Sequence, residues 1–274
     1  MENYSVLMSV YHKDAPLELQ QSIDSMLSQT VLCNQFVLVE DGPLNDGLIR
    51  VIEKYHESYS SLFTVVKLDC NQGLGKALDA GLENCKNDLV ARMDADDISL
   101  PTRCEKLLAL FQANPNLAIA GTHIDEFYDE PNNIVSKRIV PTDYESIRKF
   151  IRRRSPFNHP TVMFRKSEVL RCGGYGKMRR KQDLDLFSRM INMGCYALNL
   201  DESLLLFRSN EGNYLRRKSW EYCKSYIAVQ KENYKRGYCS LWDLIVVVIG
   251  QIIIHFMPLS LMKKISDRFL RSKI

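Results

Sequence analysis

The residues best suited to chemistry are the aspartates Asp94, Asp96 and Asp97, which follow an apolar run from Leu89 to Met93. Two carboxylates two residues apart in a turn can point toward one hard cation. Mg²⁺ and Mn²⁺ prefer such oxygen ligands and bridge them to phosphates. A cation held there would neutralise a departing diphosphate. The segment therefore predicts a Mn²⁺ or Mg²⁺ site with Asp96 and Asp94 as ligands.

The elements around these carboxylates alternate between short apolar runs and amphipathic stretches. This alternation predicts an α/β fold with a mostly parallel central sheet and helices on both faces. The expected strands are 5–10, 36–39, 63–66 and 89–93, and the expected helices are 17–27, 47–59, 74–84 and 101–113.

Two of the expected strands end in acidic residues, at Glu40-Asp41 and at Asp94. Ligands bind parallel α/β sheets outside the carboxyl ends of the strands. We therefore expect both acidic clusters to face one crevice. From residue 119 onward the pattern is less regular, with strands expected at 161–164 and 196–207.

The C-terminal part, 216–274, reads as a helical extension that is both basic and apolar. A helix is expected over 220–235, and in the apolar run 244–254 the side chain of Gln251 is the only polar one. A membrane-spanning helix needs about 20 apolar residues, so a helix lying in the membrane surface fits better. A buried helix packed on the domain and a true span remain alternatives. Basic residues follow at Lys263, Lys264, Arg268, Arg271 and Lys273.

Positive charge is concentrated although the formal net charge is only +4. Basic runs occur at 148–154 and 177–181, and such runs suit phosphorylated ligands or anionic lipid. No pair among the eight cysteines has the Cys-x-x-Cys spacing of a structural zinc site. No signal peptide precedes the first strand pattern, so reduced cysteines in the cytoplasm are expected.

Several ordered blocks resemble the family 2 inverting glycosyltransferases. They are Ser9-Val10-Tyr11, Val39-Glu40-Asp41-Gly42, Asn71-x-Gly73-Leu74-x-x-Ala77-Leu78-x-x-Gly81 and Val90-Ala91-Arg92-Met93-Asp94-Ala95-Asp96-Asp97. The block from Phe157 to Arg165 resembles the bacterial capsule and O-antigen polysaccharide branch of that family. The resemblance covers roughly residues 4–210.

This resemblance implies a GT-A fold over 1–215, with a nucleotide-sugar half at about 1–115 and an acceptor half at 116–215. It implies a UDP-sugar donor and a divalent cation. Val10, Tyr11 and Asp41 match positions that hold the base, and Asn71 and Arg92 match positions near uridine and ribose. Asp94 and Asp96 match the metal and ribose–diphosphate motif, and Asp97 matches a position that faces the donor sugar. Arg208 matches a position that meets the donor diphosphate or the flexible loop beyond it.

An inverting transfer also needs a general base on the acceptor hydroxyl. The family uses an aspartate in a Glu-Asp pair at the start of a helix, and Asp183 matches it, although Gln182 replaces the glutamate. Asp185 is the competitor and is expected on a helix face. His159 and Asn158 are candidates for contacting the acceptor or the diphosphate. The polar segment 209–218 is expected to be a loop that orders over the donor.

The predicted activity is metal-dependent, inverting transfer of a hexose or N-acetylhexosamine from a UDP-sugar to a lipid-diphosphate-linked saccharide. Such an acceptor implies a cytoplasmic enzyme attached peripherally to the anionic inner face of the plasma membrane. One alternative is a sugar nucleotidyltransferase, although residues 11–16 lack a glycine-rich phosphate loop. Another is a non-catalytic basic module for membranes or polyanions. Nucleic acid is not an expected partner, because an acidic crevice repels it. The sugar, linkage and oligomeric state stay open.

Overall fold

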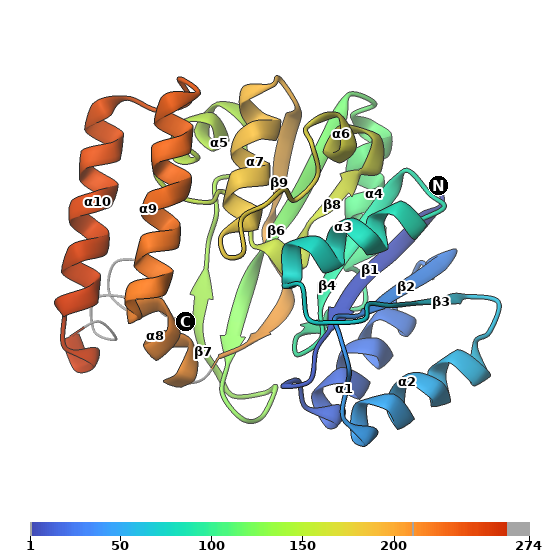
Figure 1. The fold of residues 1–274 in the computed structure, drawn as a ribbon. Coiled ribbons are helices and arrows are strands. Elements are labelled where there is room, and N and C mark those ends of the chain that lie inside the picture. Colours follow the sequence, from blue (N-terminus) through green and yellow to red (C-terminus); the bar gives the residue numbers. More distant parts are fainter. Residues whose placement is uncertain (1, 210, 262–274) are drawn as a thin grey trace.

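The computed structural model describes residues 2–209 and 211–261. Within them, nine strands form one sheet in the order β3-β2-β1-β4-β8-β6-β9-β5, with β7 beside β6 (Figure 1). The strands are β1 (Tyr4–Val10), β2 (Gln35–Glu40), β3 (Phe63–Lys67), β4 (Leu89–Asp94), β5 (Ile98–Ser99), β6 (Leu117–Phe127), β7 (Ile134–Arg138), β8 (Met163–Arg165) and β9 (Tyr196–Arg208).

Ten α-helices and one 3₁₀ turn complete the described part of the chain. They are α1 (Pro16–Leu27), α2 (Asp46–Ser58), α3 (Leu74–Asn84), α4 (Arg103–Ala113), α5 (Tyr144–Phe150), the 3₁₀ turn η1 (His159–Thr161), α6 (Lys166–Arg171), α7 (Gln182–Asn192), α8 (Glu211–Lys218), α9 (Trp220–Lys235) and α10 (Leu241–Phe256).

The sheet is mixed, which corrects the expectation of a mostly parallel one. Strands β3, β2, β1 and β4 are parallel, as the strand–helix alternation predicts. Strand β8 then runs antiparallel to both β4 and β6. The reason is that the chain turns back from β6 into the antiparallel β7. Helix α5 then carries it to β8, which lies between two strands that run the other way.

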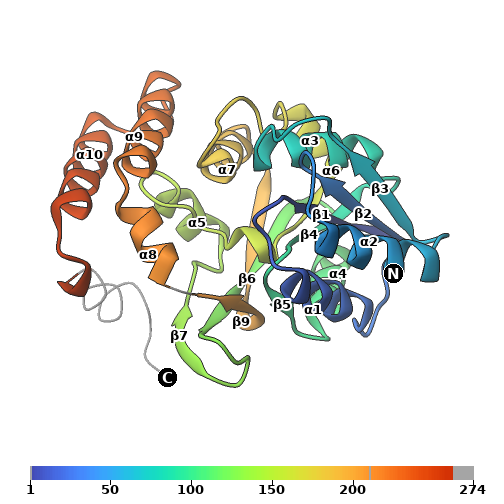
Figure 2. The ribbon, with the colours of Figure 1, turned by 60° about the horizontal axis from the view of Figure 1, so that its bottom comes forward.

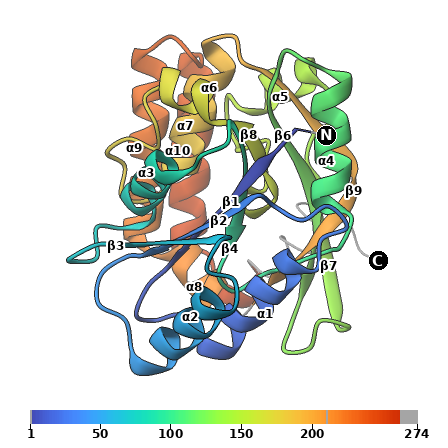
Figure 3. The same ribbon diagram turned by 90° about the vertical axis from the view of Figure 1, so that its right-hand side faces the viewer.

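The two faces of the sheet carry separate apolar cores, so the prediction of helices on both faces is confirmed (Figure 3). Alternate residues of β1 point to opposite sides: Val6 and Met8 join the core under α1, α2 and α4. Leu7 joins the other core, under α3 and α7. This period of two lets one buried strand support helices above and below it.

Helices α9 and α10 lie side by side at one end of the molecule, with α10 outermost (Figures 1 and 2). The buried side of α10 holds Asp243, Val247 and Gln251, and Asp243 pairs with Arg153 at 2.6 Å. Its outer side is apolar and exposed. No helix in the described ranges is long and apolar enough to cross a membrane. The basic residues expected at 263–273 lie outside the described residues.

Three local expectations change. The expected loop at 209–218 contains the helix α8, although residue 210 lies outside the described residues. The expected helix from Pro101 starts at Arg103, because Pro101 and Thr102 form a turn. The strand expected at 161–164 is divided between the 3₁₀ turn η1 and β8.

Candidate functional site

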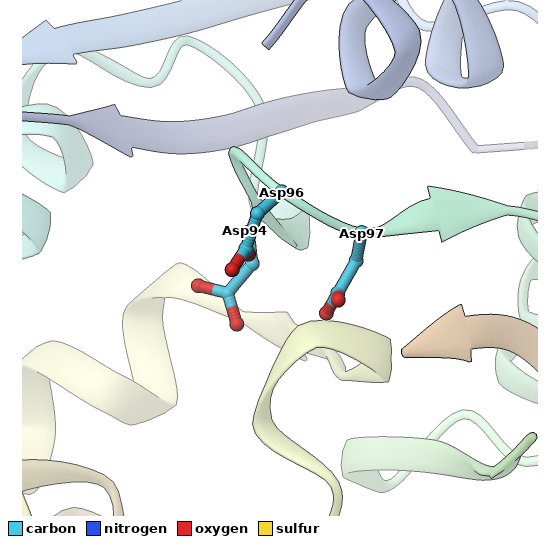
Figure 4. Close-up of side chains that lie close together, drawn as sticks. All are labelled: Asp94, Asp96 and Asp97. Carbon is cyan, nitrogen blue, oxygen red and sulfur yellow. The ribbon is translucent and has the colours of Figure 1, made fainter. Parts of the chain in front are cut away.

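The three aspartates come together where β4 ends. Asp94 is the last residue of β4, and Asp96 and Asp97 occupy the turn before β5. Ligand oxygen atoms of all three lie within 4.8 Å of one another. Figure 4 shows their carboxylates projecting to the same side of the turn. The sequence prediction of an acidic cluster at this strand end is therefore confirmed.

The cluster holds more negative charge than its surroundings balance. Burial, together with the carboxylates of Asp94 and Glu18, raises the pKa of Asp96 to about 7. Burial and the carboxylates of Asp96 and Asp94 raise the pKa of Asp97 well above its ordinary value. Its Oδ2 atom is buried and has no hydrogen-bond partner among the described residues. An oxygen donor set of this kind fits Mg²⁺ or Mn²⁺.

Arg92 is the main counter-charge within the site. Its side chain is fully buried in β4, and its Nη2 atom forms an ion pair with Asp94. Burial is the largest single effect and opposes the charged guanidinium, but Asp94, Tyr175 and Asp97 together raise the pKa of Arg92. The Nε and Nη1 atoms have no hydrogen-bond partner in the described part of the chain. Arg92 therefore holds Asp94 in place.

The end of β9 fixes the aspartate turn from the other side. The backbone N–H of Arg208 donates to Asp97 Oδ1 at 2.9 Å, and its Nε atom donates to the carbonyl oxygen of Asp96 at 2.9 Å. The same guanidinium donates to Gln21 at 2.7 Å and pairs with Glu18 at 3.5 Å. Arg208 thus belongs to the site, and in this structure it contacts the turn itself.

Three further residues near the cluster are absent from the sequence prediction: Asp14, Glu18 and Gln21. Asp14 accepts a hydrogen bond from the backbone N–H of Tyr11 at 2.9 Å. Burial and the carboxylate of Asp96 raise its pKa to about 7, against the effect of that hydrogen bond. Glu18 and Gln21 lie in α1, whose pattern shows only an amphipathic helix. No sequence signal identifies their contacts with Arg208.

The residues expected to hold the nucleotide base, Val10, Tyr11 and Asp41, lie where β1 and β2 end. Val10 is buried, whereas Tyr11 is 38% exposed. Asp41 is buried and accepts hydrogen bonds from Asn71 Nδ2 at 3.0 Å and from the backbone N–H of Gln72 at 2.7 Å. Asp41 and Asn71 are therefore brought together, and Asp41 ties the loop before α3 to the end of β2.

A pocket of about 650 Å³ lies beside that loop. Its lining includes Asn71 and Gly73 from the loop, and Lys177 and Arg179 from the segment before α7. None of the three clustered aspartates lines it. The pocket extends the polar surface from Asn71 toward the start of α7, where Asp183 lies.

Asp183 occupies the first turn of α7 and is partly exposed. Its competitor Asp185 is buried and forms ion pairs with Arg189 at 3.0 Å and Arg236 at 2.7 Å. The expectation that Asp185 sits on a helix face therefore becomes more specific: it joins α7 to the end of α9. Because Asp185 is engaged in this way, Asp183 is the carboxylate of this turn that is available for chemistry.

His159, in η1, and Asn158, directly before it, lie beneath α7. His159 Nε2 and the buried Tyr175 hydroxyl are 2.9 Å apart. Burial lowers the pKa of His159 well below its ordinary value, and the charge of Arg92 adds to the effect. Asn158 is 1% exposed and donates to the Thr122 carbonyl at 2.8 Å. Burial thus disfavours the charged form of the His159 imidazole, and Asn158 braces β6.

A model of glycosyl transferase family 2 matches residues 5–187, which contain the aspartate cluster and Asp183. The chain belongs to glycosyl transferase family 2. It is accordingly an enzyme that transfers a sugar, and the family expected from the sequence blocks is confirmed.

Two curated relatives of this family 2 glycosyltransferase cover most of its length. One is the Escherichia coli UDP-Gal:alpha-D-GlcNAc-diphosphoundecaprenol beta-1,3-galactosyltransferase, 35% identical over 97% of this chain and 98% of the relative. The other is the amylovoran biosynthesis glycosyltransferase AmsE of Erwinia amylovora, 36% identical over 83% of this chain and 84% of the relative.

A solved structure supports the fold of this family 2 glycosyltransferase. The mannosyltransferase PcManGT of Pyrobaculum calidifontis, in complex with GDP-Man and Mn²⁺, has a TM-score of 0.63 at 16% identity. The similarity covers 93% of this chain and 70% of the mannosyltransferase. The expected GT-A-like fold is thereby confirmed.

Proposed function

We propose that this enzyme transfers a hexose or N-acetylhexosamine, with inversion, from a UDP-sugar to a hydroxyl of a lipid-diphosphate-linked saccharide during surface polysaccharide synthesis. The observation that carries the proposal is the cluster of three carboxylates within 4.8 Å at the end of β4. The names of the Escherichia coli and Erwinia amylovora relatives support the substrate class and the pathway.

Asp96 and Asp94 would hold Mn²⁺ or Mg²⁺ in this proposal. The cation, when bound, neutralises the charge that develops on the departing diphosphate. Asp97 contacts the donor sugar, Val10, Tyr11 and Asp41 hold the base, and Asn71 lies by the uridine. Arg92 keeps Asp94 in its orientation by the buried ion pair. Arg208 orients the turn and meets the diphosphate.

Asp183 is the proposed general base. Its carboxylate removes the proton from the acceptor hydroxyl while the hydroxyl oxygen attacks the anomeric carbon. Its position at the opening of α7 and the ion-paired state of Asp185 support this assignment. We assign Asn158 and His159 to the wall of the acceptor site. We also propose that residues 1–215 form the catalytic domain and residues 216–274 a C-terminal extension.

The first test measures UDP release and sugar transfer with Mn²⁺ or Mg²⁺, across UDP-glucose, UDP-galactose and their N-acetylated forms. The acceptor is N-acetylglucosamine linked through diphosphate to an alkyl chain. We expect Asp96→Asn to lower the metal-dependent rate by about 10² or more, because one cation ligand is lost. The metal-free variant should melt at a higher temperature than the metal-free wild type, because the remaining carboxylates repel less.

Glu57→Gln is the matched control, because Glu57 is an exposed acid on α2 outside the cluster. It should leave the rate and the melting temperature unchanged. Absence of UDP release with every donor would contradict the proposal. Formation of a UDP-sugar from UTP and a sugar 1-phosphate would instead establish the nucleotidyltransferase alternative.

A further inference from the structure

Helix α1 has a polar side, and this side contacts the segment that carries the carboxylate cluster. Ser22 Oγ donates to the Asp94 carbonyl oxygen at 2.7 Å, and Ser25 Oγ accepts from the backbone N–H of Ser99 at 3.0 Å. Gln29 Nε2 donates to the Ser99 hydroxyl at 3.0 Å. These α1 residues recur every three or four positions, so their side chains lie along one side of the helix. Helix α1 is therefore bonded directly to the end of β4 and to β5.

Gln21 and Glu18 extend this polar side toward the start of α1, where they meet Arg208 of β9. Gln21 Oε1 accepts from Arg208 Nη2 at 2.7 Å, and Glu18 Oε1 lies 3.5 Å from Arg208 Nε. Arg208 Nε in turn donates to the carbonyl oxygen of Asp96 at 2.9 Å. The Cζ atom of Arg208 lies 4.8 Å from the ring centre of Phe127. These contacts hold the guanidinium group in one direction between α1 and the aspartate turn.

The direction of this guanidinium group matters for the cation site. It meets the turn at the carbonyl oxygen of Asp96, while the carboxylates of the cluster project to one side of the turn (Figure 4). A guanidinium group released from its partners would be attracted to the nearest carboxylates, because arginine pairs with them through two parallel hydrogen bonds. Such a pair would occupy the oxygen atoms that a divalent cation needs. An acceptor on α1 that keeps Arg208 on the backbone carbonyl therefore keeps these oxygen atoms available.

Gln21 suits this role because its amide is neutral. Glu18 also pairs with Arg208, but it adds a negative charge beside a cluster that already holds three carboxylates. The amide of Gln21 makes the shorter contact, at 2.7 Å, and adds no charge. Its side chain is partly exposed, so replacing it disturbs little packing. The contact can therefore be removed while the fold is kept.

We propose that Gln21 is a positioning residue for the divalent cation: it holds Arg208 on the backbone of the aspartate turn and so keeps the carboxylate oxygen atoms open to the metal. This rests on the proposed function, in which Asp94 and Asp96 hold Mn²⁺ or Mg²⁺. Gln21 acts on the cation through Arg208 and not by touching it. The simpler role, joining α1 to β9, is the alternative that the test separates.

The test measures Mn²⁺ affinity directly, by calorimetric titration of the whole chain with Mn²⁺, alone and with UDP present. For Gln21→Met we expect the Kd for Mn²⁺ to rise about tenfold, because the outer partners of metal ligands affect metal affinity on this scale. Gln21→Glu keeps an acceptor for Arg208 and should restore most of the affinity. The rate of UDP release by Gln21→Met should recover at high Mn²⁺ concentration, which a loss of folding would not allow.

Gln20→Met is the matched control, because Gln20 is a partly exposed residue of the same helix that points in another direction. It should leave the Kd for Mn²⁺ and the rate of UDP release unchanged. In an Arg208→Met background, Gln21→Met should have no further effect on the Kd, because Gln21 acts through Arg208.

Equal Kd values for Gln21→Met and Gln20→Met would overturn the inference. A lower melting temperature of Gln21→Met with an unchanged Kd would assign Gln21 to joining α1 and β9 alone. An undiminished effect of Gln21→Met in the Arg208→Met background would also overturn it. Absence of UDP release in the wild type would contradict the proposed function, whereas the titration with Mn²⁺ alone still decides this inference.

Discussion

Asp183 and Asp185 show how two carboxylates on one helical turn acquire different roles. Asp185 is buried between Arg189 and Arg236, whereas Asp183 is partly exposed beside Lys181. A carboxylate with both oxygen atoms engaged in ion pairs is a poor proton acceptor. The side chain left available is the one that the family resemblance placed at the base position.

We predict that Asp183→Asn abolishes transfer but leaves donor binding intact. Loss of a general base costs about 10² to 10⁴ in rate. The amide keeps the size of the side chain, so UDP and Mn²⁺ should stabilise the variant against heat as they stabilise the wild type. A variant with unchanged transfer would remove Asp183 from the mechanism. Asp185→Asn should instead lower the melting temperature, because Arg189 and Arg236 lose a buried partner.

The buried His159 makes the free energy of unfolding depend on pH. Its pKa is depressed in the folded protein, so the unfolded chain binds more protons once the pH falls below about 6.5. The free energy of unfolding should therefore fall on acidification through that value. His159→Gln removes this titration. The melting temperature of the variant should fall less than that of the wild type between about pH 7.5 and 5.5.

At the residue scale, the sequence shows clusters of adjacent residues but not contacts between residues that are far apart in the chain. Asp94, Asp96 and Asp97 are readable because they are adjacent and follow an apolar strand. The contact between Gln21 and Arg208 spans 187 residues and carries no local pattern.

At the scale of elements, helix α10 buries polar side chains and exposes apolar ones. Two of the three buried residues are polar, namely Asp243 and Gln251. The outward side carries exposed large apolar residues at helical spacing: Leu241, Trp242, Ile245, Ile249, Ile252, Ile253 and Phe256. A helix packed only against its own domain would show the opposite arrangement. We propose that this outer face lies on an anionic membrane, as the sequence led us to expect.

The prediction is that Ile249→Glu lowers the fraction of protein that sediments with anionic vesicles by several fold. Ile249 is 52% exposed, so the charge meets the bilayer without disturbing the packing on α9. Leu170→Glu is the control, because Leu170 is 48% exposed on α6. Equal sedimentation of the two variants would show that this face of α10 is not the membrane-binding surface. Fluorescence of Trp242 should shift to shorter wavelength on binding in the wild type.

Element boundaries follow the sequence well where one strand alternates with one helix. The expected helices 74–84 and 220–235 match α3 and α9 at both ends. From residue 116 onward the pattern is weaker, because the short strand β8 has few residues to show a period. Helix α8 was not predicted because Gly212 and Asn213, near its start, have low helix propensity. Its last turn leads directly into α9, which explains how such a sequence is held in a helix.

At the scale of the whole molecule, one sheet joins the two halves proposed for the donor and the acceptor. Strands β1 to β4 support the residues proposed to bind the donor, and β6 and β9 extend the same sheet toward those proposed to line the acceptor site. The parallel part was predictable from alternation. The antiparallel insertion of β8 was not, because strand order depends on the hairpin between β6 and β7 rather than on any single segment.

The link between β9 and the aspartate turn has a consequence for how the protein is made. Strand β5 pairs with β9, and Arg208 holds both Asp96 and Asp97. During synthesis the ribosome delivers residues 94–97 long before it delivers residue 208. The emerging N-terminal half therefore carries this turn with the contacts of Arg92 and Ser22 but without those of Arg208. The carboxylate cluster therefore reaches the geometry described here only after β9 has left the exit tunnel.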